Sequence, residues 1–435
     1  MDASIGAVEA RIFENLLLQR IYDRLSENER DVFLAASIFF TRTPLAALSA
    51  VVDKPADELT PILAALRDWS LCFWDAQEQL FDVHALTRTW LRNQQQPTLD
   101  QFKTFSQRAG KFFKEQPTWD DELLAKAYFE QAEAWEAYAE TTLKLEGHYR
   151  LIGLYPAARA LAQEVLVKNI SPLLNAEAQN SLGMLSISIG DYAEALSYLE
   201  QSMSNYLQIG DKKGEGTILN NISQIYDAQG DYGRALSYLE QSLSIQQQIG
   251  DKSGEGTTLN NLATTAYAQG DYDRALSYLE QSLSIQQQIG DKSGEGTTLN
   301  NISQIYRVAG DNDRALSYLE QSLRIRQQIG DKKGEGTTLN NISQIYDAQG
   351  DYGRALSYLE QSLSIQQQIG DKSGEGTTLN NISQIYRVAG DNDRALSYLE
   401  QSLSIQQQIG DKKGEGTTLN NLATTAYAQG IMIGR

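Results

Sequence analysis

Cysteine and histidine are nearly absent from this 435-residue sequence, which has one cysteine, Cys72, and two histidines, His84 and His148. A single cysteine permits no disulfide framework, so we expect a reducing compartment. The same scarcity provides neither a Cys/His metal cluster nor a Cys/His catalytic pair. We therefore predict no metal site, no cofactor and no enzymatic activity.

Long apolar runs and an excess of basic residues are also missing. No stretch approaches the roughly 18 uninterrupted apolar residues of a membrane helix, and acidic Asp2, Glu9 and Glu14 stand where a signal peptide carries basic residues. The 56 acidic and 37 basic residues give a formal net charge of −19. Nucleic-acid binding depends on Lys and Arg, which neutralise phosphates. We expect a cytoplasmic chain that binds neither membrane nor nucleic acid.

What the sequence does contain is a repeat. From Gly210 onward the chain repeats nearly the same forty residues, IGDKxGEGTTLNNxxxxxxxxGDxxRALSYLEQSLSIQQQ. A fixed period of this size is typical of a solenoid, in which each unit buries its apolar face only against its neighbours. Solenoids work through an extended surface, and this favours binding over catalysis. The glycines of the GDK step mark the period: Gly210, Gly250, Gly290, Gly330, Gly370 and Gly410.

Each unit is predicted to be a pair of antiparallel helices. In 211–250, apolar residues recur at three- and four-residue spacing in two segments. Gly230 ends the first helix and Asp231 begins the second as its N-cap. Gly214 and Gly216 lie in the first turn, where each glycine costs roughly 1 kcal/mol relative to alanine. Their return in every full unit predicts either a close approach of helices or a frayed first turn.

These helix pairs resemble the tetratricopeptide repeat (TPR), and the forty-residue length is similar to the long-helix variety found in kinesin light chains. The resemblance covers about 171–430 and implies an all-α, right-handed superhelical solenoid of six full repeats and a final half repeat. Ala266 and Ala426 depart from the pattern where Tyr is usual. The residues that meet the pattern, in their usual order, are Leu219, Ile222, Tyr226, Gly230, Tyr232, Ala235, Leu239 and Ser242.

The resemblance also implies that the first helix of each unit lines a concave groove. An amide side chain both donates and accepts hydrogen bonds, so a ladder of asparagines can hold an extended peptide of any sequence. In kinesin-light-chain-like repeats the residue at this position contacts bound peptide. The alternative is that the asparagines bridge adjacent helices. Gln224 is a further groove candidate, and the ladder consists of Asn221, Asn261, Asn301, Asn341, Asn381 and Asn421.

One position of the first helix changes in character while the packing residues stay fixed. It follows the usual Tyr and should face the groove, so that a ligand would meet a different charge or ring in each unit. Drift among recently duplicated units is the competing explanation. The residues are Asp227, Tyr267, Arg307, Asp347, Arg387 and Tyr427. A second set, expected to pack between helices, is Tyr238, Tyr278, Tyr318, Tyr358 and Tyr398.

Residues 10–93 differ in kind. The string LSENERDVFLAASIF … LAALRDWSLCFWDAQEQLFDVHALTRTWL resembles the winged-helix domain that follows the ATPase core in STAND-type signalling NTPases. The wing of that family ends in a Met-His-Asp-like motif, and His84, between Val83 and Ala85, matches its histidine. The resemblance implies a nucleotide-sensing role for His84. Before any resemblance, the spacing predicts helices at 10–25, 27–39, 44–52 and 56–69, strands at 71–75 and 80–84, and a closing helix, ALTRTWLRN.

The expected organisation is a winged-helix-like domain at 1–95, a helical connector with a diverged TPR at 96–170, the tandem array at 171–430 and a truncated tail at 431–435. No Walker A motif occurs, and the last repeat stops without its second helix. We expect the C-terminal part of a STAND-type protein, or a relative without its motor. The uncapped end should fray or self-associate.

The interpretation is protein–protein recognition through the concave face, with an extended peptide or a partner helix as ligand. Two alternatives remain. One is a transcriptional regulator that places the winged helix on DNA, although segment 56–69 has three acidic residues against one Arg. The other is a structural spacer or self-assembly module, which concentration-dependent association would favour.

Overall fold

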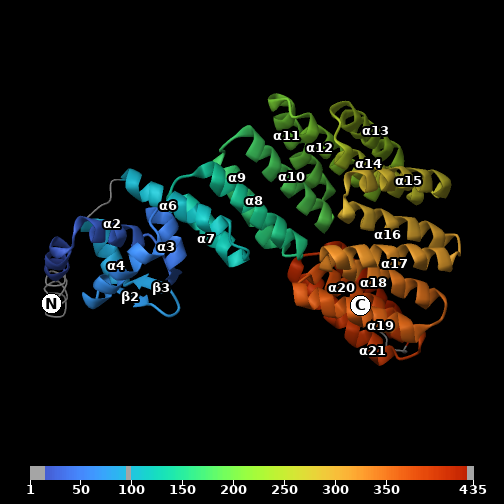
Figure 1. Ribbon diagram of the computed structural model, residues 1–435. Coiled ribbons are helices and arrows are strands. Elements are labelled where there is room, and N and C mark those ends of the chain that lie inside the picture. Colours follow the sequence, from blue (N-terminus) through green and yellow to red (C-terminus); the bar gives the residue numbers. More distant parts are fainter. Residues whose placement is uncertain (1–14, 95–98, 429–435) are drawn as a thin grey trace, which may run out of the picture. The chain divides into compact units, whose positions relative to one another are not determined.

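The computed structural model describes residues 15–94 and 99–428 and is dominated by helices (Figure 1). The chain forms two compact units, residues 1–145 and 146–435. This division lies within the stretch 96–170 that the sequence assigns to a connector. The expected boundary at 95–96 and the tail at 431–435 lie outside the described residues. The all-α class is confirmed.

The first unit begins with short helices and a three-stranded sheet in the segment where a winged helix is expected. Its small sheet is antiparallel, with strand order β1-β3-β2, and Trp74 lies opposite Phe81 in the wing. The expected elements are found to within a few residues; of the helix expected at 10–25, residues 15–24 are described and helical. In order, the elements are α2 (Glu27–Ala36), β1 (Thr43–Pro44), α3 (Leu45–Val52), α4 (Ala56–Asp68), β2 (Cys72–Asp75), β3 (Leu80–Val83) and α5 (Ala85–Gln94).

Strand β1 was not predicted, because two residues are too few to show an alternating pattern. The start of α2, in contrast, follows from a capping box. The Ser26 hydroxyl accepts a hydrogen bond from the Glu29 backbone N–H at 3.3 Å, and the Glu29 carboxylate accepts one from the Ser26 backbone N–H at 2.7 Å.

Three further helices complete the first unit: α6 (Leu99–Lys114), α7 (Trp119–Gln131) and the start of α8 (Trp135–Leu151). They share one core with the winged helix. The buried Tyr128 ring of α7 stacks on Phe113 with centroids 5.6 Å apart and meets Phe39 edge-on at 5.8 Å. Its hydroxyl accepts from the Phe40 backbone N–H at 3.3 Å. Residues expected in a connector thus bury the apolar surface of the preceding helices.

The second unit is a row of antiparallel helix pairs, shown from green to red in Figure 1. We call the even-numbered helix of each pair helix A and the odd-numbered one helix B. The TPR-like solenoid is confirmed. After α9 (Tyr155–Lys168) the helices are α10 (Pro172–Ile189), α11 (Tyr192–Ile209), α12 (Lys212–Ala228), α13 (Tyr232–Ile249), α14 (Lys252–Ala268), α15 (Tyr272–Ile289), α16 (Lys292–Val308), α17 (Asn312–Ile329), α18 (Lys332–Ala348), α19 (Tyr352–Ile369), α20 (Lys372–Val388), α21 (Asn392–Ile409) and α22 (Lys412–Ala428).

The predicted caps are present, and they decide between the two explanations for the paired glycines. The Asp211 carboxylate accepts from the Gly214 backbone N–H at 3.0 Å, so the first turn of α12 is capped and not frayed. A Cβ on Gly214 would lie 2.2 Å from the Tyr206 ring, which shows a close approach. A Cβ on Gly216 would lie 3.6 Å from Gln246, an ordinary contact. Close packing therefore explains the first glycine and not the second.

A buried polar network joins each unit to the next. The Asn340 side-chain N–H₂ of α18 donates to the hydroxyls of Ser362 in α19 and Thr378 in α20, both at 2.7 Å. Ser362 donates to the Gly336 carbonyl at 2.8 Å, and Thr378 donates to the Gln366 side-chain oxygen at 2.7 Å. One amide thus ties three helices together across a unit boundary. The same network recurs around Asn220 and Asn260.

Tyrosine pairs hold helix A against helix B within a unit. The rings of Tyr226 and Tyr238 stack with centroids 5.4 Å apart and planes at 5°, and the Arg234 guanidinium covers Tyr226 at 4.3 Å. The expectation that the helix-B tyrosines pack between helices is confirmed by these stacks. Equivalent pairs are Tyr306–Tyr318, Tyr346–Tyr358 and Tyr386–Tyr398.

The second unit also curls far enough for distant repeats to touch. The backbone N–H of Lys372, at the start of α20, donates to the Ile152 carbonyl at 3.0 Å. The side chains of Tyr155 and Ser373 hydrogen-bond beside it. Helices A of successive units contact each other along the inside of this curl.

The buried network predicts that replacing its asparagine by alanine lowers the free energy of unfolding more at Asn340 than at the equivalent Asn420. Asn340→Ala leaves buried partners unsatisfied and should lower the free energy of unfolding by about 1–3 kcal/mol. Asn420→Ala alters the same position in α22, where the side chain is exposed, and should change it by less than about 0.5 kcal/mol. Urea unfolding followed by circular dichroism measures both. Equal losses in the two variants would contradict the network's role.

Candidate binding groove

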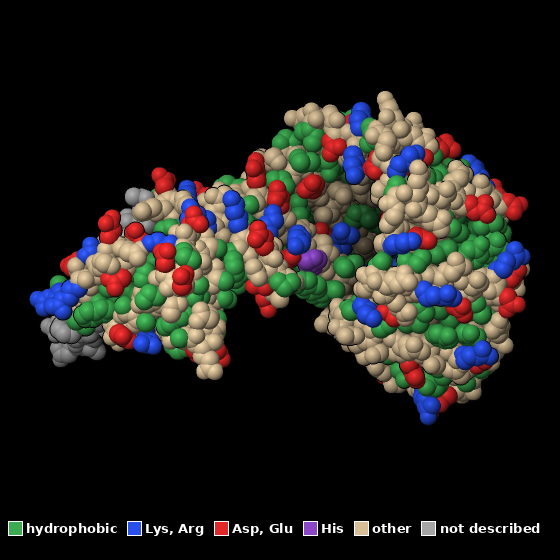
Figure 2. All heavy atoms as spheres, in the orientation of Figure 1, with side chains coloured by type: hydrophobic (Ala, Val, Ile, Leu, Met, Phe, Trp, Pro, Cys, Tyr) green, Lys and Arg blue, Asp and Glu red, His purple; other side chains and the backbone are tan. Residues whose placement is uncertain are grey.

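Six of the thirteen predicted groove residues line three hollows on the inside of the second unit, and Figure 2 shows the array hollowed there. Gln224, Asp227 and Asn261 line a cavity of about 320 Å³. Tyr267 and Asn301 line a neighbouring cavity of about 200 Å³. A third cavity, of about 420 Å³, includes Asn381 in its lining. The structure thus brings together residues that lie some forty positions apart in the sequence.

The asparagine ladder bridges adjacent helices A. In five of the six ladder residues the side-chain nitrogen donates to an asparagine oxygen one unit earlier, at distances from 2.7 to 3.2 Å. Asn341 is the exception, because the side-chain oxygen of Asn300, one unit earlier, is buried without a hydrogen-bond partner. The amide nitrogens therefore bridge adjacent helices, as the alternative interpretation holds. The side-chain oxygens, which accept hydrogen bonds, are the atoms that a ligand would contact. Contact between these oxygens and a peptide stays a prediction. The bonded pairs are Asn221–Asn180, Asn261–Asn220, Asn301–Asn260, Asn381–Asn340 and Asn421–Asn380.

The variable position differs in environment as well as in charge. Asp227 is half-buried, and its Oδ1 is buried without a hydrogen-bond partner. Burial raises the pKa of Asp347. Arg307 donates from Nε to the Gln304 side-chain oxygen at 2.9 Å, whereas Arg387 and Tyr427 are exposed. The groove therefore presents carboxylates, guanidiniums and phenols in changing order.

The 200 Å³ cavity lies beside a missing tyrosine. In α16, Tyr306 packs with Leu319 and Ile345. The matching residue of α14 is Ala266, which lies with Leu279 and Ile305, and both of these line the cavity. The cavity therefore lies against the counterparts of two residues that pack with the tyrosine ring in the next unit. The departure at Ala266 is visible in the sequence, but its consequence is not.

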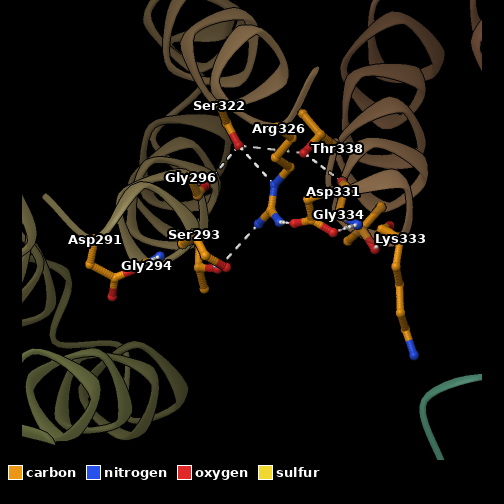
Figure 3. Close-up of polar contacts among 12 residues, drawn as sticks. Asp291, Ser293, Gly294, Gly296, Ser322, Arg326, Asp331, Lys333, Gly334 and Thr338 are labelled. Atoms are coloured by element: carbon orange, nitrogen blue, oxygen red, sulfur yellow. Dashed lines mark hydrogen bonds and ion pairs between the residues drawn. The ribbon is translucent and has the colours of Figure 1, made fainter. Parts of the chain in front are cut away.

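Arg326 is a second departure from the repeat (Figure 3). It is 6% exposed and replaces a glutamine that four other units carry. Its Nη1 lies 2.5 Å from the Asp331 carboxylate, Nη2 donates to Thr297 at 3.2 Å, and Nε donates to Ser322 at 3.3 Å. Thr338, whose counterparts donate to that glutamine, donates instead to a backbone carbonyl in its own helix. Arg326 thus belongs to the junction between units.

The other candidates from the sequence give no catalytic arrangement. Burial raises the pKa of the Cys72 thiol to about 12, so the thiol stays protonated. His84 is exposed at the end of β3, and its carbonyl accepts from the Arg88 backbone N–H at 2.8 Å. Within 15–94 and 99–428 no three His, Cys, Asp or Glu residues are placed to hold a metal ion. No helix in the same residues is long and apolar enough to span a membrane.

Comparison with known proteins supports the repeat assignment. A family model described as tetratricopeptide repeat matches more than half of the chain, at residues 174–248, 228–288, 254–328, 294–368 and 374–430. Comparison with curated protein sequences gives no match.

Comparison with solved structures gives matches that include two proteins with tetratricopeptide-like repeats. One is a signal transduction ATPase with numerous domains (STAND) protein with a tetratricopeptide repeat sensor from Pyrococcus horikoshii, at 20% identity and a TM-score of 0.64. The match covers 96% of this chain and 62% of that one, so this chain spans less than two thirds of its length. The other is a putative kinesin light chain with nearly identical TPR-like repeats from Podosopora anserina, at 21% identity, 43% and 92% coverage and a TM-score of 0.36.

The junction around Arg326 predicts that the usual glutamine can replace it. A buried ion pair adds little net stability when a well-packed alternative exists, so Arg326→Gln should keep the free energy of unfolding within about 0.5 kcal/mol or raise it. Arg326→Ala removes the same hydrogen bonds and leaves a cavity, and should lower it by about 1–3 kcal/mol. Urea unfolding compares the two variants. An equal loss in both would show that the arginine itself is required.

Proposed function

The chain belongs to the tetratricopeptide repeat family, and we propose that its array binds an extended peptide segment of a partner protein in the concave groove, without catalysing a reaction. The observation that carries the proposal is the contrast between two sets of positions. Apart from Ala266 and Ala426, most packing residues are the same from unit to unit, whereas the groove-facing series from Asp227 to Tyr427 changes charge and ring. Cavities lie beside members of that series.

The chemistry of the groove supports an extended peptide as the ligand. The ladder offers side-chain oxygens at a fixed period, and these can accept hydrogen bonds from peptide N–H groups of any sequence. The changing residues would then supply selectivity. Drift among duplicated units explains the changes equally well in sequence terms, so binding measurements must separate the two.

The likeness to the STAND protein supports a more specific role. We propose that this chain provides the sensor part of a cytoplasmic signalling protein, in which ligand capture by the array is passed to a nucleotide-binding module. His84, exposed at the end of the wing, is the proposed contact to nucleotide in such an assembly. This role rests on likeness in fold.

The binding proposal predicts that groove substitutions reduce affinity without unfolding the array. The probe is a displayed library of random peptides about a dozen residues long, which when extended span several units. For the selected peptides, the double variant Asn301→Ala, Asn341→Ala should lower affinity about tenfold or more, because several acceptors are lost. The matched control is Gln321→Ala, Gln361→Ala on exposed faces of helices B. Loss of affinity only in parallel with loss of helical circular dichroism, or no loss, contradicts the proposal.

A specific observation favours self-association as a second candidate function. Leu419 of α22 is 47% exposed, whereas its counterparts Leu299 and Leu379 in α16 and α20 are each 3% exposed. An exposed apolar face of this kind favours contact with another helix.

Self-association predicts that the sedimentation coefficient of the chain rises with protein concentration. Leu419→Asp should abolish the rise, and Thr424→Asp on an exposed site of the same helix should not. A monomer at every concentration tested would remove this candidate.

A further inference from the structure

The cavity beside Ala266 has the lining of a socket for a ring. Leu279, Ile305 and Tyr267 supply apolar and aromatic surface, and Asn301 supplies a polar group. A ring is absent here because α14 carries Ala266, whereas α12, α16, α18 and α20 each carry a stacked tyrosine. Unfilled apolar space of this kind lowers stability, so a ligand group that fills it gains apolar burial.

The helix-B tyrosine of the α14–α15 unit, Tyr278, also lacks a stacking partner. Ala266 stands where α12, α16, α18 and α20 carry the tyrosine that would stack against it. The Tyr278 hydroxyl instead accepts from Arg274 Nε at 3.1 Å, and the Arg274 guanidinium lies 5.4 Å from the Tyr278 ring centroid. The Tyr267 ring contacts the Tyr272 ring, and the two ring centroids are 5.4 Å apart. None of these residues occupies the cavity.

Opposite charges flank the cavity along the groove. On the α12 side, Asp227 lines the 320 Å³ cavity, which shares Thr264 with the smaller one. Lys413 of α22 lines the same cavity, yet the buried Oδ1 of Asp227 has no hydrogen-bond partner. An unpaired buried carboxylate oxygen is costly, so this oxygen favours a cationic partner. On the α16 side, Arg307 is held by Gln304, a rim residue. The three successive helices A thus offer a carboxylate, an apolar socket and a guanidinium.

The spacing of these three features fits an extended chain. Packed helices lie about 8–10 Å apart, and helices A of successive units are in contact. An extended peptide advances about 3.3 Å per residue, so neighbouring features correspond to positions about three residues apart.

We propose that the ligand of the groove is an extended peptide that places an aromatic side chain in the cavity beside Ala266. A Lys or Arg about three residues away pairs with Asp227, and an Asp or Glu about three residues away on the other side pairs with Arg307. This inference rests on the proposed function and names the chemistry of its ligand. It also fixes the register, because the next carboxylate and guanidinium, Asp347 and Arg387, lie on the consecutive helices α18 and α20 with no helix A between them, and both helices carry a stacked tyrosine.

The test uses the full chain and synthetic peptides in which Lys and Glu flank a central Phe, each separated from it by two Gly residues. Both chain directions are made, and in a companion series Ala replaces Phe. Ala266→Tyr fills the cavity with the residue that neighbouring units carry, and Ala266→Ser is the matched control, since Ser186 stands at this position in α10. We expect the Phe peptide of one direction to bind about tenfold or more tightly than its Ala companion. Ala266→Tyr should remove that difference, and Ala266→Ser should keep it.

A charge exchange tests the flanks. Arg307→Asp introduces the residue that α18 carries at Asp347, and should reverse the preference from a peptide with Glu on that side to one with Lys. If Ala266→Tyr fails to fold, Thr264→Gln narrows the rim with the residue found at Gln224 and should weaken Phe binding in the same direction.

The outcomes separate this inference from the proposed function. If Phe and Ala peptides bind equally, or Ala266→Tyr leaves the Phe preference intact, the socket is wrong, while groove-dependent peptides from the random library would keep the broader proposal. If neither the designed peptides nor any library peptide binds in a groove-dependent way, both fail. A Phe preference that disappears only with Ala266→Tyr supports the socket.

Discussion

A buried amide of helix A decides how consecutive units stack around α12, α14, α18 and α20. Asn340 is engaged at both ends: its nitrogen donates to hydroxyls on α19 and α20, and its oxygen accepts from Asn381 of α20 at 3.1 Å. A shift of one unit along its neighbour would leave these buried groups without partners, at a cost of about 1–3 kcal/mol for each. Apolar contacts are non-directional and would tolerate such a shift. The polar network therefore fixes the register that the apolar faces alone leave free.

A fixed register has a consequence for the groove. Four buried asparagines accept a hydrogen bond from the next helix A, and these are Asn220, Asn260, Asn340 and Asn380. The side chains about two turns further along helix A therefore recur at a constant offset. Asp227, Tyr267 and Arg307 occupy that offset in three successive helices. Substitutions there leave the stacking unchanged, so the surface can diversify while the frame is preserved. Ala266 differs from these substitutions, because it removes a packing ring and lies beside a cavity next to the groove-facing residues.

Periodicity explains why so much of the array could be predicted. Helix bounds, Asp caps and Gly ends are local properties that repeat. The sequence also predicted that the helix-B tyrosines pack between helices. Three features were not predictable, because each depends on contacts between distant residues. Strand β1 is too short to show a pattern, and Tyr128 contacts the segment after α2 through the Phe39 ring and through a hydrogen bond from the Phe40 backbone N–H. The socket beside Ala266 required knowing which residues surround the missing ring.

The most direct test of the account is where a bound peptide lies. A groove-binding peptide that carries a photoreactive benzophenone side chain at its aromatic position can be cross-linked to the full chain and the attachment sites mapped by mass spectrometry. The account predicts attachment to α14 and α16, at residues that line the cavity beside Ala266. Attachment to the outer faces of helices B, or to the first unit, would contradict it.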